Sequence, residues 1–320
     1  MRDRRVTVFG GSGFVGRYLV RRLAAAGARV DVAVRDPERA LPLKTMGAVG
    51  QIAPVAANIR NADSVARAVE GADTVFNLVG LLYEGGAQTF QAVHASGAEA
   101  VARAASAAGV RRLVHMSALG AAAESSAAYA KTKAAGEAAV TAAFADATVV
   151  RASVVFGAED SFFNLFGGLA RISPVLPLIG GGETRLQPVY VDDVAAGMVA
   201  LVNDLSTAGR TYEFAGPRIY SFRDVMDIVL RESGRRRLLV PVPFWATKVM
   251  AYFLQYWPRP LLTVDQVRLL QADNVATPGS LGLTDLGIVP TPVDDVLPSY
   301  MKRYRRAGAS HGSESINGTA

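Results

Sequence analysis

The stretch that decides the fold reads Val6-Thr7-Val8-Phe9-Gly10-Gly11-Ser12-Gly13-Phe14-Val15-Gly16. Its first four residues form a short, mostly apolar run, which predicts a buried parallel strand. Glycines then follow in a G-x-x-G-x-x-G spacing and open a helix expected from about Phe14 to Ala26, where Gly27 stops it. A second strand is expected at 29–34. This order of strand, glycine turn, helix and strand predicts a βαβ unit that binds the diphosphate of a dinucleotide.

The three spaced glycines have separate physical roles. Gly10 permits a tight turn, Gly13 lets the backbone approach the diphosphate, and Gly16 lets the helix pack closely on the sheet. The anion then contacts free N–H groups at the positive end of the helix dipole. We therefore expect the whole turn to bind the cofactor, through Gly10, Ser12, Gly13, Phe14, Val15 and Gly16.

Further apolar runs continue this pattern along the chain. Strands are expected at 51–55, 74–78, 112–116 and 148–151, and alanine-rich helical stretches separate the later ones. The alternation predicts an α/β fold, a doubly wound parallel sheet of the Rossmann type with helices on both faces. It weakens after about Phe156, where Gly- and Pro-rich loops begin. We expect a dinucleotide-binding domain at 1–160, a smaller C-terminal α/β domain at 161–306 with some segments returning to the sheet, and a disordered tail at 307–320.

The composition excludes several classes of protein. Of 320 residues, 50% are hydrophobic and 19% are charged, which fits a globular chain rather than a disordered one. There is no cysteine, so disulfides, thiol nucleophiles and cysteine zinc sites are excluded. The three histidines are scattered without metal-ligand spacing, and no metal site is expected. The net charge of +6 fits an anionic ligand or a membrane surface, and equally ordinary solvated arginines.

The N-terminus and the hydropathy predict a cytoplasmic location. The charged start, Met1-Arg-Asp-Arg-Arg5, runs straight into a strand, so no secretory signal is expected. No stretch reaches the ~18 uninterrupted apolar residues that a spanning helix needs. A peripheral position on the cytoplasmic face of the inner membrane stays open.

The end of the second strand is where a dinucleotide site selects its cofactor. An NAD site places a carboxylate there to accept hydrogen bonds from the ribose 2′-hydroxyl, whereas this chain has Arg35. A guanidinium matches the oxygens of a 2′-phosphate, which favours NADP(H) over NAD(H). Asp36 keeps the alternative open, because it could accept from a 2′-hydroxyl or cap the next helix.

Tyr129 and Lys133 form a Tyr-x-x-x-Lys pair after the fifth expected strand. At this spacing on a helix both side chains lie on one face. Lys133 would lower the pKa of Tyr129 and could hydrogen-bond a nicotinamide ribose. Tyr129 could then donate a proton to a carbonyl as hydride arrives, or remove one from an alcohol in reverse. The alternative is a solvated helix face that carries the pair by chance.

Several motifs together resemble a known family. The glycine turn, Tyr129 with Lys133, Asn77-Leu-Val-Gly80 and Gln187-Pro-Val-Tyr-Val-Asp-Asp193 resemble an extended or atypical short-chain dehydrogenase/reductase of the NAD(P)-dependent epimerase/dehydratase type, to about Arg305. Within that superfamily the nearer likeness is to the nucleotide-binding accessory subunits of respiratory complex I and their bacterial relatives. That narrower likeness is carried by His115-Met-Ser117-Ala-Leu119, Phe156-Gly-Ala-Glu-Asp160, Gln187-Pro-Val-Tyr190 and Asp285-Leu-Gly287.

The resemblance implies a role for each group of site residues. It implies NADPH bound by Gly10, Gly13, Gly16 and Arg35, and a short-chain dehydrogenase type of Rossmann fold. Asn58 and Ile59 are expected near the adenine. The residues expected to approach the ribose and the nicotinamide are Leu78, Val79, Gly80, Tyr129 and Lys133.

Two positions depart from the family pattern. Active members place a serine or threonine just beyond the fifth strand to hydrogen-bond the substrate oxygen, but here the strand ends at Ser117 and the position two further on is Leu119. Ser117, the third candidate catalytic residue, is therefore expected to line the nicotinamide pocket. The proline that commonly follows Arg151 is replaced by Ala152. This incomplete set suffices to bind cofactor but weakens the case for turnover, since one missing donor typically costs ~10²–10³ in rate.

The second domain carries the most unusual stretch of the chain. Residues 244–257 are heavily aromatic with only Lys248 charged, and Arg235-Arg236-Arg237 lies just before them. Such a segment fits an anionic membrane surface, docking on a membrane complex such as respiratory complex I, or an apolar substrate. A core helix beside solvated arginines is the alternative. Residues 302–306 add a second basic cluster, and no nucleic-acid recognition motif accompanies either one.

Two functions fit this sequence. The first is an accessory or assembly factor of respiratory complex I (NADH:quinone oxidoreductase) in which NADP(H) is mainly structural. The second is an active NADPH-dependent reductase, or an epimerase or dehydratase, acting on a nucleotide sugar or an apolar carbonyl compound through Tyr129 and Lys133. The absent hydroxyl favours the first function, and the retained tyrosine and lysine favour the second.

Overall fold

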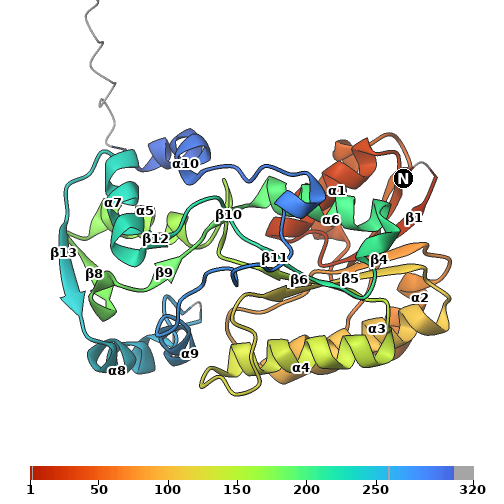
Figure 1. Cartoon of the computed structure of the whole chain (residues 1–320), viewed down its shortest axis with the longest axis horizontal. Helices are drawn as coiled ribbons and strands as arrows, with labels where there is room; N and C mark the ends of the chain where they lie inside the picture. Colours follow the sequence, from red (N-terminus) through yellow and green to blue (C-terminus); the bar gives the residue numbers. More distant parts are fainter. Residues whose placement is uncertain (2, 259, 306–320) are drawn as a thin grey trace, which may run out of the picture.

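A parallel sheet runs through the larger part of the computed structural model, which describes residues 1, 3–258 and 260–305 (Figure 1). The tail expected at 307–320 lies outside these residues. The described strands follow the order β11-β6-β5-β4-β1-β2-β3, so the direction of winding reverses between β1 and β4. The seven strands are β1 (Arg5–Phe9), β2 (Arg29–Val34), β3 (Ile52–Ala56), β4 (Thr74–Asn77), β5 (Arg112–Ala118), β6 (Thr148–Ala152) and β11 (Thr211–Phe214).

Helices cover both faces of this sheet (Figure 1). One face packs against α1 (Phe14–Ala25) and α6 (Val191–Asn203). The other packs against α2 (Ala62–Val69), α3 (Gly97–Ala107) and α4 (Ala128–Ala143). The α/β, doubly wound parallel arrangement predicted from the sequence is therefore confirmed.

Six of the seven strands lie where the apolar runs predicted them, because most of their side chains are buried and must be apolar. β3 at the edge of the sheet is the most exposed of the six, and β11 was not predicted. β5 and β6 extend further than expected. Their ladder continues through Ser117 opposite Arg151 to Ala118 opposite Ala152. This extension brings Ser117 and Arg151 to the carboxyl edge of the sheet, where α/β proteins bind ligands.

The region after Phe156 is built from short two-stranded sheets and helices (Figure 1). Its helices α5 (Phe163–Ile172), α7 (Phe222–Glu232) and α10 (Val293–Met301) enclose a core of their own around Phe163, Leu176 and Leu297. The parallel pairs are β7 (Val155–Phe156) with β10 (Val189–Tyr190) and β8 (Val175–Ile179) with β13 (Leu238–Val242); the antiparallel pair is β9 (Arg185–Leu186) with β12 (Tyr220–Ser221).

The aromatic stretch forms α8 (Phe244–Leu254), which is followed by α9 (Val264–Leu269). α8 buries Thr247 and Ala251 and turns most of its large side chains outward, apart from Phe244, which packs against the core of this region. The alternative of a core helix is therefore wrong for α8. No helix among the described residues is long and apolar enough to span a bilayer.

After Phe156 the chain returns to the large sheet with α6, with β11 and again near Asn274. β11 pairs with β6 and buries Tyr212 and Phe214 in the core beside α6. Later, Asn274 Oδ1 accepts hydrogen bonds from Ser153 Oγ at 2.7 Å and from the Val154 N–H at 3.2 Å. The two regions are therefore joined by more than one crossing of the chain.

Candidate functional site

The turn between β1 and α1 is shaped by its glycines. Gly10 has φ +78°, a left-handed conformation that glycine adopts without strain. A Cβ on Gly16 would lie 2.4 Å from the Gly10 carbonyl oxygen and 2.6 Å from Gly11 Cα, so the start of α1 packs directly on the turn. α1 begins at Phe14 with no described side chain capping it. Its first N–H groups, from Phe14 onward, are thus available to an anion, whereas the Gly13 N–H already donates to the Gly10 carbonyl oxygen at 2.9 Å.

The segment after β4 connects this turn to the helix of Tyr129 and Lys133. A Cβ on Gly10 would meet the backbone of Leu78 and Val79 at 3.3 Å. At the far end of the same segment, a Cβ on Gly80 would lie 3.4 Å from Lys133 Nζ. The structure therefore brings the glycine turn, Leu78–Gly80 and Lys133 together along the carboxyl edge of β1 and β4.

Arg35 follows the end of β2 at this same edge. It is exposed, and it has neither a hydrogen bond nor an ion pair within the described residues. Asp36, the competing candidate, is ion-paired with Arg39 at 3.1 Å. The guanidinium of Arg35 is thus available to a phosphate, while the carboxylate beside it already has a partner.

Asn58 and Ile59 follow β3. Asn58 Oδ1 accepts from the Arg60 N–H at 3.1 Å, and the Asn58 N–H donates to Ser64 Oγ at 2.9 Å. Ile59 is buried and packs against Gly97 of α3. Both side chains therefore stabilise the local fold, and their expected proximity to an adenine stays a prediction.

Tyr129 and Lys133 lie in the first two turns of α4. Lys133 is buried, its Nζ donates to the Met116 carbonyl oxygen at 3.1 Å, and it lies 6.0 Å from the centre of the Tyr129 ring. Burial raises the pKa of Tyr129 to about 12. The expectation that Lys133 lowers this pKa is wrong, because burial alone governs it and the ammonium is directed to Met116.

His94 completes the surroundings of Tyr129. It belongs to a π-helical turn, η2 (Gln91–Ser96), and its ring lies edge-on to Tyr129 with centres 5.2 Å apart. His94 Nε2 accepts from the Leu81 N–H at 2.9 Å, and Nδ1 lies 3.1 Å from Thr132 Oγ1. Burial, together with the charge of Lys133, lowers its pKa to about 3. His94 is therefore an uncharged side chain that packs beside Tyr129. The sequence did not single out this residue.

His115 and Ser117 lie two residues apart on β5 and are both buried. His115 Nδ1 lies 3.3 Å from Asn77 Nδ2, and burial lowers the pKa of His115 to about 3. His115 Nε2 and Ser117 Oγ have no hydrogen-bond partner among the described residues. Leu119 is also buried, so the position where active members carry a hydroxyl is filled by an apolar side chain.

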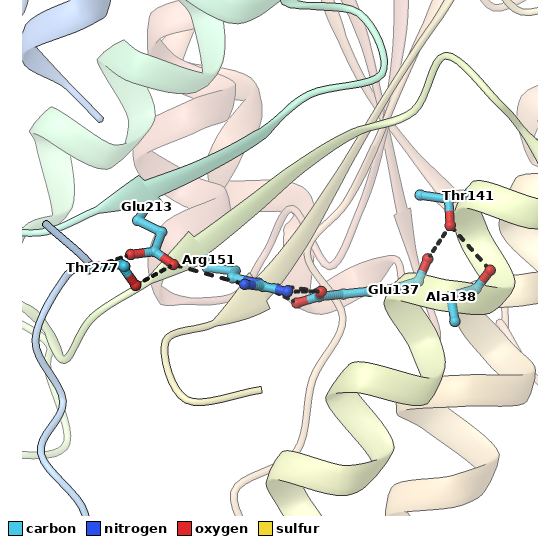
Figure 2. A network of polar contacts seen from close by, with 6 residues as sticks. All are labelled: Glu137, Ala138, Thr141, Arg151, Glu213 and Thr277. Atoms are coloured by element: carbon cyan, nitrogen blue, oxygen red, sulfur yellow. Dashed lines mark hydrogen bonds and ion pairs between the residues drawn. The ribbon is translucent and has the colours of Figure 1, made fainter. Parts of the chain in front are cut away.

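A chain of charged groups anchors α4 to the edge of the sheet (Figure 2). Arg151 Nη2 on β6 contacts Glu137 Oε2 on α4 at 2.7 Å, and its Nη1 lies 3.7 Å from Glu213 Oε1 on β11. Glu213 Oε2 in turn accepts from the Thr277 N–H at 2.6 Å. Glu137 lies one helical turn beyond Lys133, so the network fixes the helix that carries both candidate catalytic groups. The sequence singled out Arg151 but not its partners, which lie far along the chain.

The sequence over residues 6–215 matches the family described as NAD dependent epimerase/dehydratase family. The chain belongs to the NAD dependent epimerase/dehydratase family. The matched region runs from β1 to the end of β11, and so contains every strand of the large sheet with the glycine turn, Tyr129 and Lys133.

Comparison with individual proteins extends the similarity beyond residues 6–215. The chain is 36% identical over 322 residues to the protein of Arabidopsis thaliana named NADH dehydrogenase [ubiquinone] 1 alpha subcomplex subunit 9, mitochondrial. The aligned region covers 96% of this chain and 79% of the relative. It is 35% identical over 195 residues to the ceramide reductase of Caulobacter vibrioides, covering 61% and 60%. The NADP(H) complex of Citrobacter sp. triphenylmethane reductase has a TM-score of 0.74 at 19% identity, covering 93% and 99%, which shows a shared fold.

Lys133 gives this epimerase/dehydratase-family site a predicted pH dependence. Burial lowers its pKa from the ordinary 10.5 to about 8, and the charge of Glu137 opposes that shift. As the pH rises through about 8, the folded protein loses a charge that favours an anionic nucleotide. We therefore expect NADP(H) affinity, measured by calorimetry, to decline above about pH 8.

A Lys133→Met protein is the control, because its affinity should not change over that pH range. Unfolding does not account for the decline. Between about pH 8 and 10.5 the unfolded chain binds more protons at Lys133 than the folded one, so this residue makes the free energy of unfolding rise with pH. A native affinity that stays constant above pH 8 would show that the charge of Lys133 does not contribute to binding.

Proposed function

We propose that this protein is an accessory or assembly component of respiratory complex I that binds NADP(H) mainly as a structural cofactor. The observation that carries the proposal is the 36% identity to a complex I subunit over nearly the whole chain. The site fits the cofactor: free N–H groups start α1, and the available guanidinium of Arg35 suits a 2′-phosphate. Bound nucleotide would stabilise the folded protein by mass action.

The chemistry around Tyr129 supports binding more than turnover. NADPH supplies a hydride when bound, and a reductase must then deliver a proton to the substrate oxygen. Tyr129 has a pKa of about 12, Lys133 donates to Met116, and Leu119 replaces the hydroxyl that would position a substrate. The group that would position a carbonyl is thus missing, although Tyr129 carries its proton at neutral pH.

The test is purification of complex I from the membranes of the source cell. We expect the chain to migrate with the complex on native gels and to retain NADP(H), identified by mass spectrometry after gentle purification. The retained nucleotide should survive incubation with carbonyl compounds. Absence of the chain from the complex, with an unchanged complex in a deletion strain, would contradict the proposal.

A second candidate function is the reduction of an apolar carbonyl compound. The relative named ceramide reductase favours it, because Tyr129 and Lys133 are in place here. Single-turnover loss of the NADPH absorbance with long-chain 3-oxo amides tests it. Rapid oxidation that disappears in a Tyr129→Phe protein would favour this function. Conversion of a nucleotide sugar with no net loss of NADPH would instead indicate an epimerase or dehydratase, because those reactions return the hydride to the sugar.

For the accessory role we further propose that α8 docks the protein on the cytoplasmic face of the inner membrane. The outward side of α8 and its C-terminal extension form a docking face, which consists of Trp245, Val249, Tyr252, Phe253, Tyr256 and Trp257. The helix buries small side chains and exposes large ones, the reverse of an ordinary surface helix. Tryptophan and tyrosine favour the bilayer interface, and Lys248 with the exposed Arg236 favours anionic lipid.

The two tryptophans make this docking directly measurable. They are the only two in the chain, both lie in the docking face, and each is 72% exposed. We expect their emission to shift to shorter wavelength on mixing with phosphatidylcholine vesicles that contain phosphatidylglycerol, and less so with phosphatidylcholine alone.

A Tyr252→Ser, Phe253→Ser protein keeps both tryptophans and should bind these vesicles about tenfold more weakly or worse, since it loses two aromatic anchors. The matched control is Leu205→Ser, Val289→Ser, which removes two apolar side chains outside the docking face that are more exposed than Tyr252 and Phe253. A shift seen only with isolated complex I would assign the face to a protein partner instead.

A further inference from the structure

The helix that carries Tyr129 does not cap its own N-terminus. The residue before α4 is Ala127, which has no side chain able to accept a hydrogen bond. Both oxygens of Asp265 fill this role from α9: Oδ1 accepts from the Ala128 N–H at 2.7 Å and Oδ2 from the Tyr129 N–H at 3.0 Å. A carboxylate here satisfies two helix donors and complements the helix dipole.

α9 is built so that Asp265 can face α4. Thr263 and Gln266 form a capping box that satisfies the start of α9, so the Asp265 carboxylate is not needed there. The Asp265 side chain is 15% exposed, and the charged group facing it is Arg268 on the same helix, at 3.9 Å. Gln266 Nε2 also reaches the Leu82 carbonyl at 3.5 Å, just beyond Leu78–Gly80.

α9 also packs against α8, and the two helices lie side by side (Figure 1). α8 and its extension to Trp257 therefore carry the docking face on the outer side, and α9 carries Asp265 on the inner side. A continuous set of packed elements runs from the docking face through Asp265 to the first turn of α4, where Tyr129 lies.

We infer that Asp265 is a positioning residue that couples the candidate nucleotide site to the docking face. Nucleotide bound against Tyr129 and Lys133 orders the start of α4, Asp265 transmits that order to α9, and the docking face on α8 becomes less mobile. This inference rests on the proposed function, because it needs a nucleotide site and a docking face. By linkage, a partner on α8 tightens nucleotide binding by the same factor.

The stability that the Asp265 cap gives to α4 limits the size of the coupling. Removing a helix cap changes the stability of the capped segment by a factor of about 2 to 30. We therefore expect saturating NADP⁺ to slow amide hydrogen exchange in 244–270 by about 2- to 30-fold in the native chain. Exchange at 128–133 should slow as well.

The decisive comparison is Asp265→Asn against Asp273→Asn. Asp265→Asn removes the charge and one acceptor, whereas Asp273→Asn removes a carboxylate that pairs with Arg185 and does not contact α4. In Asp265→Asn, NADP⁺ should still slow exchange at 128–133 but no longer in 244–270. Asp273→Asn should behave as the native chain does.

Other outcomes separate the inference from the function on which it rests. No NADP⁺-dependent slowing in 244–270 of the native chain, or the same slowing in Asp265→Asn, overturns the coupling while leaving the nucleotide site intact. Calorimetry on the same samples reports nucleotide binding itself. If no heat of binding is found, the proposed function fails and the coupling fails with it.

Discussion

A Gly16→Ala protein is expected to bind NADP(H) at least about 100-fold more weakly than the native chain and to lose about 1–3 kcal/mol of free energy of unfolding. The new Cβ would lie 2.4 Å from the Gly10 carbonyl oxygen, and this backbone atom cannot rotate away as a side chain could. The turn must shift, and its N–H groups then no longer meet the diphosphate together. Calorimetry with NADPH and urea unfolding measure the two effects.

Gly168→Ala is the matched control for this change. Gly168 lies in α5, and a Cβ there would meet nothing within 4 Å. Its substitution should leave NADPH affinity unchanged and stabilise the helix slightly, since alanine is the better helix former. Native affinity in Gly16→Ala would show that the glycine turn is not the diphosphate site.

Arg35→Ala should separate the two pyridine nucleotides. We expect NADPH affinity to fall about 10- to 100-fold, because each hydrogen bond between a guanidinium and a phosphate contributes about 1.5–3 kcal/mol. NADH lacks the 2′-phosphate, so its affinity should change less than about threefold. Calorimetric titrations of one preparation with both nucleotides measure the ratio.

The control for Arg35 is Arg29→Ala, since Arg29 is an exposed arginine at the opposite end of β2. It removes the same net charge without touching the carboxyl edge of the sheet. Equal losses for NADPH and NADH in Arg35→Ala would refute the assignment to NADP(H), as would a similar loss in Arg29→Ala.

Local patterns in the sequence predicted the first six strands and the glycine turn. Buried parallel strands need unbroken apolar runs, and a left-handed turn needs glycine, so both features are visible over ten or so residues. The Tyr129–Lys133 pair was likewise visible as a helical spacing. For these features the structure adds the geometry, since Gly16 packs closely on Gly10 and Gly80 lies close to Lys133.

Contacts between distant segments were not predictable in this way. The cap on α4 comes from Asp265, and the partners of Arg151 come from α4 and β11. His94 enters the site through a π-helical turn, whose extra residue leaves no signature in hydrophobic periodicity. The same limit applied to α8, because composition alone does not distinguish an outward aromatic side from a buried one.

The return of β11 to the sheet bears on how this protein is made. Its position beside β6 means that the sheet is complete only after Phe214 has left the ribosome, long after the glycine turn has been synthesised. Until then β6 is an unpaired edge, and the core beside α6 lacks Tyr212 and Phe214. A nascent chain that stalls near residue 160 would therefore expose an unpaired edge strand that is prone to aggregate. Such a chain would depend on chaperones to prevent aggregation.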